Sequence, residues 1–118
     1  MILPKKAPMT DTITICAGCH ADGAKPRGKA LARALRPLVG ATTQVRTTDC
    51  MNACGHPTLV AFRAPGKPVY LFQNVDPATQ AQEIADFAHA YATHKGGIVA
   101  DARPFGQLRY CLVGRIPG

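Results

Sequence analysis

The stretch "DTITICAGCH", residues 11–20, places alternating threonine and isoleucine residues directly before a pair of cysteines. This alternation is typical of a half-buried strand, so we predict a strand over residues 11–16 that ends at Cys16. The run that follows, residues 17–28, is rich in glycine and also holds aspartate and proline, which predicts a loop. The chain therefore brings Cys16, and three residues later Cys19, to one end of a sheet.

A second cysteine pair repeats this arrangement. "TTQVRTTDC", residues 42–50, predicts a strand that ends at Cys50, and Cys54 lies in the loop that follows. Between the two strands we predict a helix from Pro26 to Leu38, in which Arg33 and Arg36 face away from the apolar stripe. That stripe consists of residues spaced at i, i+3, i+4 and i+7: Leu31, Ala34, Leu35 and Leu38.

A strand–helix–strand beginning predicts two parallel strands joined by a right-handed crossover. Parallel strands end at the same edge of a sheet, where α/β folds place their ligands. The topology therefore predicts one site built from the two pairs: Cys16, Cys19, Cys50 and Cys54.

The remaining pattern predicts two short strands, residues 58–62 and 68–72, joined by a Pro-Gly turn. A second helix follows, with Asp76 as N-cap, Pro77 at its first position and Gly96-Gly97 at its end. Its predicted apolar stripe is Ile84, Phe87, Ala88 and Tyr91.

A last strand is expected near residues 107–113. This element order is typical of a thioredoxin-like α/β domain, with a mixed sheet covered by two helices. We expect residues 1–10 to form a flexible tail and residues 11–118 a single domain, of which residues 97–118 are a C-terminal extension.

Four thiolates suit either a tetrahedral zinc ion or an iron–sulfur cluster. A [2Fe–2S] cluster takes two ligands on each iron, which matches ligands that come in two pairs. Glycines beside the cysteines, Gly18, Gly23 and Gly55, let backbone N–H groups approach sulfur, and His20 and His56 are candidates for outer hydrogen bonds.

The chain also resembles known proteins. The two cysteine pairs, each after a strand, resemble those of the thioredoxin-like [2Fe–2S] ferredoxins. The stretches "TITICAGC", "TTDCMNACGHPTLVAF" and "GKPVYLF", with the C-terminal "RP…GRIP", are similar to DUF1636, a family of small bacterial predicted metal-binding proteins. This resemblance implies a metal or cluster site at the four cysteines, and the family is associated with cobalamin and cobalt metabolism. Relative to the ferredoxins, the first pair is tighter and the C-terminal extension is additional.

Other functions of the cysteines fit the pattern less well. Cys16 to His20 reads C-x-x-C-H, the attachment signal of a c-type haem, but no signal peptide precedes it and a strand leads into it. A thiol–disulfide oxidoreductase would use Cys16 and Cys19, yet a loop separates them from the helix start that would favour a thiolate. Cys111, inside an apolar run, is expected to be a buried small hydrophobe.

No acid/base pair or nucleophilic triad is visible, so a carrier or binding module is favoured over an enzyme. The three hypotheses are a [2Fe–2S] electron carrier, a zinc or other divalent-metal binding or delivery module, and the oxidoreductase. The net charge of +7 is concentrated around the first helix, which suits an acidic redox partner. A homodimer is a further expectation. No aromatic residues interleave with these cations, which argues against nucleic acid. With no signal or membrane segment apparent, we expect a cytoplasmic protein.

Overall fold

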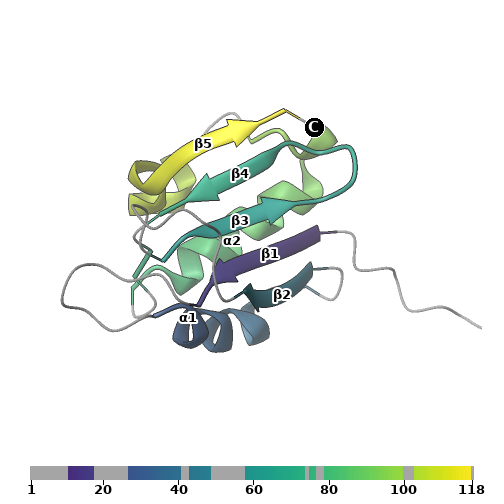
Figure 1. Ribbon diagram of the computed structural model, residues 1–118. Helices are drawn as coiled ribbons and strands as arrows, with labels where there is room; N and C mark the ends of the chain where they lie inside the picture. The colour runs from purple at the N-terminus through teal and green to yellow at the C-terminus, as the bar shows by residue number, and fades with distance from the viewer. Residues whose placement is uncertain are drawn as a thin grey trace, which may run out of the picture.

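The computed structural model describes residues 11–17, 27–40, 43–48, 58–73, 75–76, 79–99 and 103–117. The expected tail, residues 1–10, lies outside them. A five-stranded sheet has the order β2-β1-β3-β4-β5, with β1 and β2 parallel and the other neighbours antiparallel (Figure 1). The strands are β1 (Asp11–Cys16), β2 (Thr43–Thr48), β3 (Val60–Arg63), β4 (Val69–Phe72) and β5 (Leu112–Ile116), and the α-helices are α1 (Gly28–Leu35) and α2 (Ala81–Thr93).

Both α-helices cover the same side of this sheet. Ile13 and Ile15 of β1 are fully buried there, in one core cluster with Leu31 of α1 and Ile84 of α2. Side chains of a strand point alternately to its two faces. On the other face of β1 the threonines are only half-buried, and Gln44 and Arg46 of β2 are exposed on that face. The predicted mixed sheet covered by two helices is confirmed, and the structure places both helices on one face.

Aromatic rings centred on Phe87 fill the space between the sheet and α2. The ring of Phe87 lies 4.8 Å from that of Phe62, 5.0 Å from Phe72, 5.1 Å from Tyr70 and 5.3 Å from Phe105, each pair edge-on. Edge-to-face pairs of this kind stabilise a core beyond the effect of area alone, by about 0.5–1.5 kcal/mol each. The four phenylalanines of the chain thus join β3, β4, α2 and the C-terminal residues.

The end of the first helix differs from the prediction. α1 stops at Leu35, and Arg36–Leu38 form a 3-10 turn, η1, that contains Pro37. The predicted apolar position Leu38 is 44% exposed, whereas Ala32 is buried. A 3-10 turn has 3.0 residues per turn in place of 3.6, so the i+7 position leaves the buried stripe.

The start of the second helix was also predicted wrongly. α2 begins at Ala81 with Gln80 as its N-cap residue, so Asp76 is not the N-cap. Asp76 forms a turn before the helix, in which its N–H donates to Gln80 Oε1 (2.8 Å) and its carbonyl accepts the Gln80 N–H (2.8 Å). Pro77 lies outside the described residues. The predicted buried stripe of this helix is confirmed: Ile84, Phe87, Ala88 and Tyr91.

The C-terminal residues begin with 3-10 turns and end in a strand. Arg103–Cys111, η3, precede β5, so the strand starts at Leu112 and not near Gln107. The turns bury Phe105 and Leu108 in the same core cluster as the helices. Because these two side chains pack beneath α2, the chain pairs with β4 only after it has passed the core. The C-terminal extension is thus packed into the core.

A partly buried ion pair lies at the other end of β1. Lys67 Nζ, in the turn before β4, donates to Asp11 Oδ1 (2.9 Å) and to the Tyr91 carbonyl (3.0 Å). The Tyr91 hydroxyl donates to the Pro68 carbonyl (2.7 Å). Burial, with the negative charge of Asp11 as the next cause, raises the pKa of Tyr91 to about 12. These contacts join the start of β1, the β3–β4 turn and the end of α2.

Candidate metal centre

The candidate site begins where β1 and β2 end side by side. Cys16 is paired with Thr48 in parallel register, and the Ala17 N–H donates to the Thr48 carbonyl (2.7 Å). The carboxyl ends of the two strands therefore share one edge of the sheet, as the sequence predicts. The second cysteine pair follows Thr48 by two and six residues.

After the second cysteine pair, the backbone is hydrogen-bonded to Cys16 again. The Cys16 N–H donates to the Leu59 carbonyl (3.0 Å), immediately before β3 begins. Cys16 and Ala17 are thus bonded through their backbones to the residues on both sides of segment 49–57. Both ends of the segment that contains Cys50 and Cys54 are fixed beside Cys16.

The first helix is packed against the same backbone. A Cβ atom added to Gly28, the first residue of α1, would lie 2.8 Å from Ala17 Cα and 2.9 Å from the Cys16 carbonyl carbon. Real Cβ atoms do not approach other atoms so closely, so a residue with a side chain does not fit here. The helix start, the end of β1 and the ends of segment 49–57 therefore meet at Cys16–Ala17.

Cys16 is the predicted ligand that the structure describes. Its side chain is fully buried and its sulfur takes part in a disulfide bond, so a second sulfur lies next to it. The other predicted ligands and hydrogen-bonding neighbours lie outside the described residues: Cys19, Cys50, Cys54, His20, His56, Gly18, Gly23 and Gly55. Among the described residues, no three histidine, cysteine or acidic side chains lie close enough together to bind a metal ion.

Thr58 is a feature of this edge that sequence reasoning missed. Its side chain is fully buried, its φ angle is 49°, and no hydrogen-bond partner reaches its Oγ1 in the described structure. An ordinary threonine in a loop gives no sequence signal of such a backbone conformation.

Cys111 departs from the expected buried hydrophobe. It is only half-buried and carries a free thiol. Gln80 Nε2 donates to its sulfur (3.5 Å), and the thiol donates to the Gln107 carbonyl (3.8 Å). It lies at the rim of an open polar hollow of about 500 Å³ that is also lined by Arg27, Asp76, Thr79, Gln80, Glu83, Gln107 and Tyr110.

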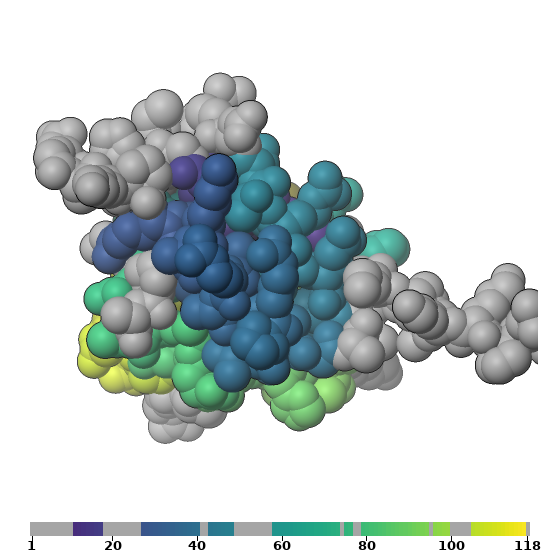
Figure 2. All heavy atoms as spheres, turned by 90° about the horizontal axis from the view of Figure 1, so that it is seen from below, coloured from purple at the N-terminus to yellow at the C-terminus, as the bar shows by residue number. Residues whose placement is uncertain are grey.

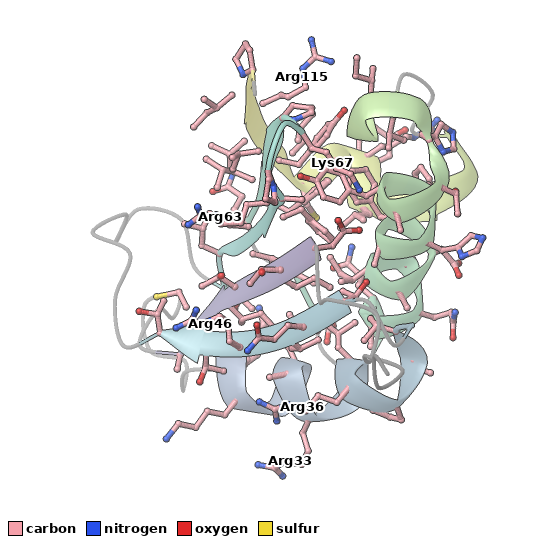
Figure 3. The ribbon with its side chains drawn as sticks, turned by 90° about the vertical axis from the view of Figure 1, so that its right-hand side faces the viewer. Arg33, Arg36, Arg46, Arg63, Lys67 and Arg115 are labelled. Atoms are coloured by element: carbon pink, nitrogen blue, oxygen red, sulfur yellow. The ribbon has the colours of Figure 1, made fainter. Side chains whose placement is uncertain are left out.

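A basic surface extends away from the carboxyl ends of β1 and β2, which we call the cysteine edge. Three cations at i, i+4 and i+7 are exposed on α1 and η1, and Arg46 is exposed on the adjacent strand β2: Lys29, Arg33, Arg36 and Arg46. Figure 2 shows α1 and β2 forming one continuous face, and Figure 3 shows Arg33 and Arg36 pointing outward from it. The described ion pairs lie elsewhere, between Arg27 and Asp76 (3.9 Å) and between Lys67 and Asp11. Within the described part of the chain, neither ion pair includes any of these four cations.

The fold places the chain in a class of known structure. It matches two structures of a thioredoxin-like [2Fe–2S] ferredoxin from Aquifex aeolicus, one of them the wild type at 1.5 Å resolution. The TM-scores are 0.51 and 0.56 at 20% identity in both cases, over 92% and 95% of this chain and 99% and 98% of the ferredoxin chains. The class is therefore the thioredoxin-like ferredoxin fold.

The chain belongs to the family DUF1636, described as a protein of unknown function, whose profile matches residues 13–118. No curated protein matches the sequence. In the part of the chain that the structure describes, no helix is long and apolar enough to cross a membrane.

Proposed function

We propose that this protein binds an iron–sulfur cluster, [2Fe–2S], through Cys16, Cys19, Cys50 and Cys54, and that it carries electrons as a ferredoxin does. One observation carries the proposal: the backbone of Cys16 and Ala17 is hydrogen-bonded to the residues on both sides of the segment that contains the second pair. The likeness to the Aquifex ferredoxin supports the fold in which such a site would be built.

Chain geometry supports the meeting of all four sulfurs. Consecutive Cα atoms are about 3.8 Å apart, so Cys50 lies within about 8 Å of Thr48, and Cys19 within about 11 Å of Cys16. Cys54 precedes Leu59, the bonded neighbour of Cys16, by five residues. The disulfide bond of Cys16 is in accord with a second sulfur within reach of it.

The residues of the edge fit a sulfur-ligated group. Four thiolates are the usual donors to iron–sulfur clusters, and a bound cluster would supply one-electron chemistry. Gly28 lets the start of α1 approach the backbone that holds Cys16. The buried Thr58 hydroxyl, without a partner among the described residues, is a donor of the kind that sulfur accepts.

We also propose that the electron-transfer partner is an acidic protein that docks on the basic surface of α1 and β2. The three cations Lys29, Arg33 and Arg36 form a stripe along one helix face whose first turn lies at the cysteine edge. Complementary charge steers and orients such encounters.

The alternative is a zinc or other divalent-metal module, because four thiolates also suit tetrahedral zinc. The family resemblance connects such a module with cobalt and cobalamin metabolism. A thiol–disulfide oxidoreductase would also account for the disulfide bond of Cys16, but this side chain is 0% exposed and a reactive thiol requires access.

The proposal is tested by anaerobic purification followed by a visible spectrum and measurement of iron, acid-labile sulfide and zinc. We expect a brown protein with iron and sulfide in equal amounts. The Cys50→Ser variant should lose the colour, the iron and the sulfide. Cys111→Ser is the matched control and should keep full content. A colourless protein with one zinc ion would contradict the electron-carrier function and support the metal-binding module. A metal-free protein that cycles between dithiol and disulfide would support the oxidoreductase.

A further inference from the structure

Thr58 holds a backbone conformation that its side chain disfavours. Its φ of 49° lies in the left-handed region, and every other positive-φ residue in the described structure is a glycine. A β-branched residue is a genuine outlier there, because its side chain crowds the backbone. Conformations of this kind persist where the surrounding structure imposes them, and they cluster at functional sites.

The hydroxyl of this residue is equally unusual. The side chain is 0% exposed, and Oγ1 has no hydrogen-bond partner among the described residues. Buried polar atoms are nearly always paired, so an unpaired one calls for an explanation such as an ion or a redox role. A threonine hydroxyl carries one O–H donor, which is available here.

The location of Thr58 indicates what could accept that hydrogen bond. It directly follows the segment that contains Cys50 and Cys54, and it precedes Leu59, whose carbonyl accepts the Cys16 N–H at 3.0 Å. Its backbone therefore lies at the edge of the sheet where the four cysteines are proposed to meet.

We propose that the Thr58 hydroxyl donates a hydrogen bond to a sulfur of the bound cluster and raises its reduction potential. This inference rests on the proposed function. Hydrogen bonds to sulfur favour the more negative, reduced state of an iron–sulfur centre, so each of them raises the reduction potential. Thr58 would act as a positioning residue, since it holds a donor at the site without being a ligand.

The test compares Thr58→Val with Thr58→Ser in the cluster-loaded protein by redox titration and by cluster loss to a chelator. Valine keeps the branched shape and removes the donor, whereas serine restores it. We expect Thr58→Val to shift the potential to more negative values and to lose its cluster about tenfold faster, and Thr58→Ser to return both towards wild type. Thr43→Val, at a buried threonine at the opposite end of the parallel strand pair, is the matched control and should change neither property.

A second measurement separates this role from a structural one. In the cluster-free protein the hydroxyl has no described partner, so Thr58→Val should unfold at the same urea concentration as wild type or at a higher one. Reduced stability of the cluster-free protein together with an unchanged potential would overturn the inference. If the wild-type protein contains no iron and sulfide, the proposed function itself fails; if it contains them and Thr58→Val is indistinguishable from wild type, only the role of Thr58 fails.

Discussion

At the scale of single residues, the site depends on how closely the chain can approach itself. Gly28 is tightly packed because the backbone of Cys16 and Ala17 occupies the space where a side chain would lie. Its contribution is therefore steric. A helix would normally gain about 1 kcal/mol from alanine in place of glycine, but only where there is room for the methyl group.

We predict that Gly28→Ala destabilises the protein by about 1–3 kcal/mol, the usual cost of overpacking, and weakens retention of the proposed metal centre. Urea unfolding followed by circular dichroism measures the first effect, and metal content after gel filtration the second. Gly40→Ala is the matched control, because nothing lies within 4 Å of its added Cβ. Equal unfolding midpoints for the two variants would contradict the steric role of Gly28.

At the scale of elements, α1 connects the cysteine edge to the surface charge. The helix starts at the cysteine edge and carries Lys29 in its first turn and Arg33 one turn further along, with Arg36 in the following 3-10 turn. With a rise of about 1.5 Å per residue, Arg36 lies about 10 Å beyond Lys29 along the axis, which is roughly one Debye length at 0.1 M salt. The three cations should therefore differ in their influence on charged electron acceptors.

We predict that Lys29→Glu slows oxidation of the reduced protein by anionic hexacyanoferrate(III) several-fold at about 0.1 M ionic strength and accelerates oxidation by cationic hexaamminecobalt(III). Stopped-flow absorbance measures both rates. Arg36→Glu should have a smaller effect. Arg115→Glu makes the same change in net charge and should have the smallest effect. Arg115 is on β5, the outer strand on the far side of the sheet from β2 (Figure 3). Equal effects of the three variants would show that only net charge matters and would remove the support for docking on α1.

Much of the secondary structure was predictable from the sequence. Alternating Thr and Ile in β1, and the apolar spacing of α2, are local patterns that the structure confirms. Leu38 was misplaced because helical periodicity was extended through Pro37, where the helix had already tightened. Asp76 was misplaced because its turn with Gln80 delays the helix by four residues. Thr58 could not be found, since its φ depends on how the chain enters β3 and not on its neighbours in sequence.

At the scale of the whole molecule, the C-terminal residues belong to the core. Leu108 is 0% exposed and Phe105 packs on Phe87 at 5.3 Å, while β5 extends the sheet beside β4. We therefore propose that residues 103–117 unfold together with the rest of the described chain, as expected for a single domain.

We predict that Leu108→Ala lowers the free energy of unfolding by about 2–5 kcal/mol, in one cooperative transition. Leu112→Ala, four residues away, is the control: its side chain is 45% exposed, and the loss should remain below about 1 kcal/mol. Urea titrations followed by circular dichroism and by tyrosine fluorescence should give coincident curves. Two separate transitions would indicate that the C-terminal residues form an independent unit.

The backbone hydrogen bonds at Cys16 and Ala17 bear on whether the chain folds before or after it binds its proposed cluster. The Thr48 and Leu59 carbonyls accept hydrogen bonds from the Ala17 and Cys16 N–H groups, and the core cluster is built largely from apolar side chains of the strands, the helices and η3. Small zinc fingers, by contrast, are unfolded without their metal. We therefore predict that the chain folds without the proposed cluster, so that iron starvation would leave a folded acceptor.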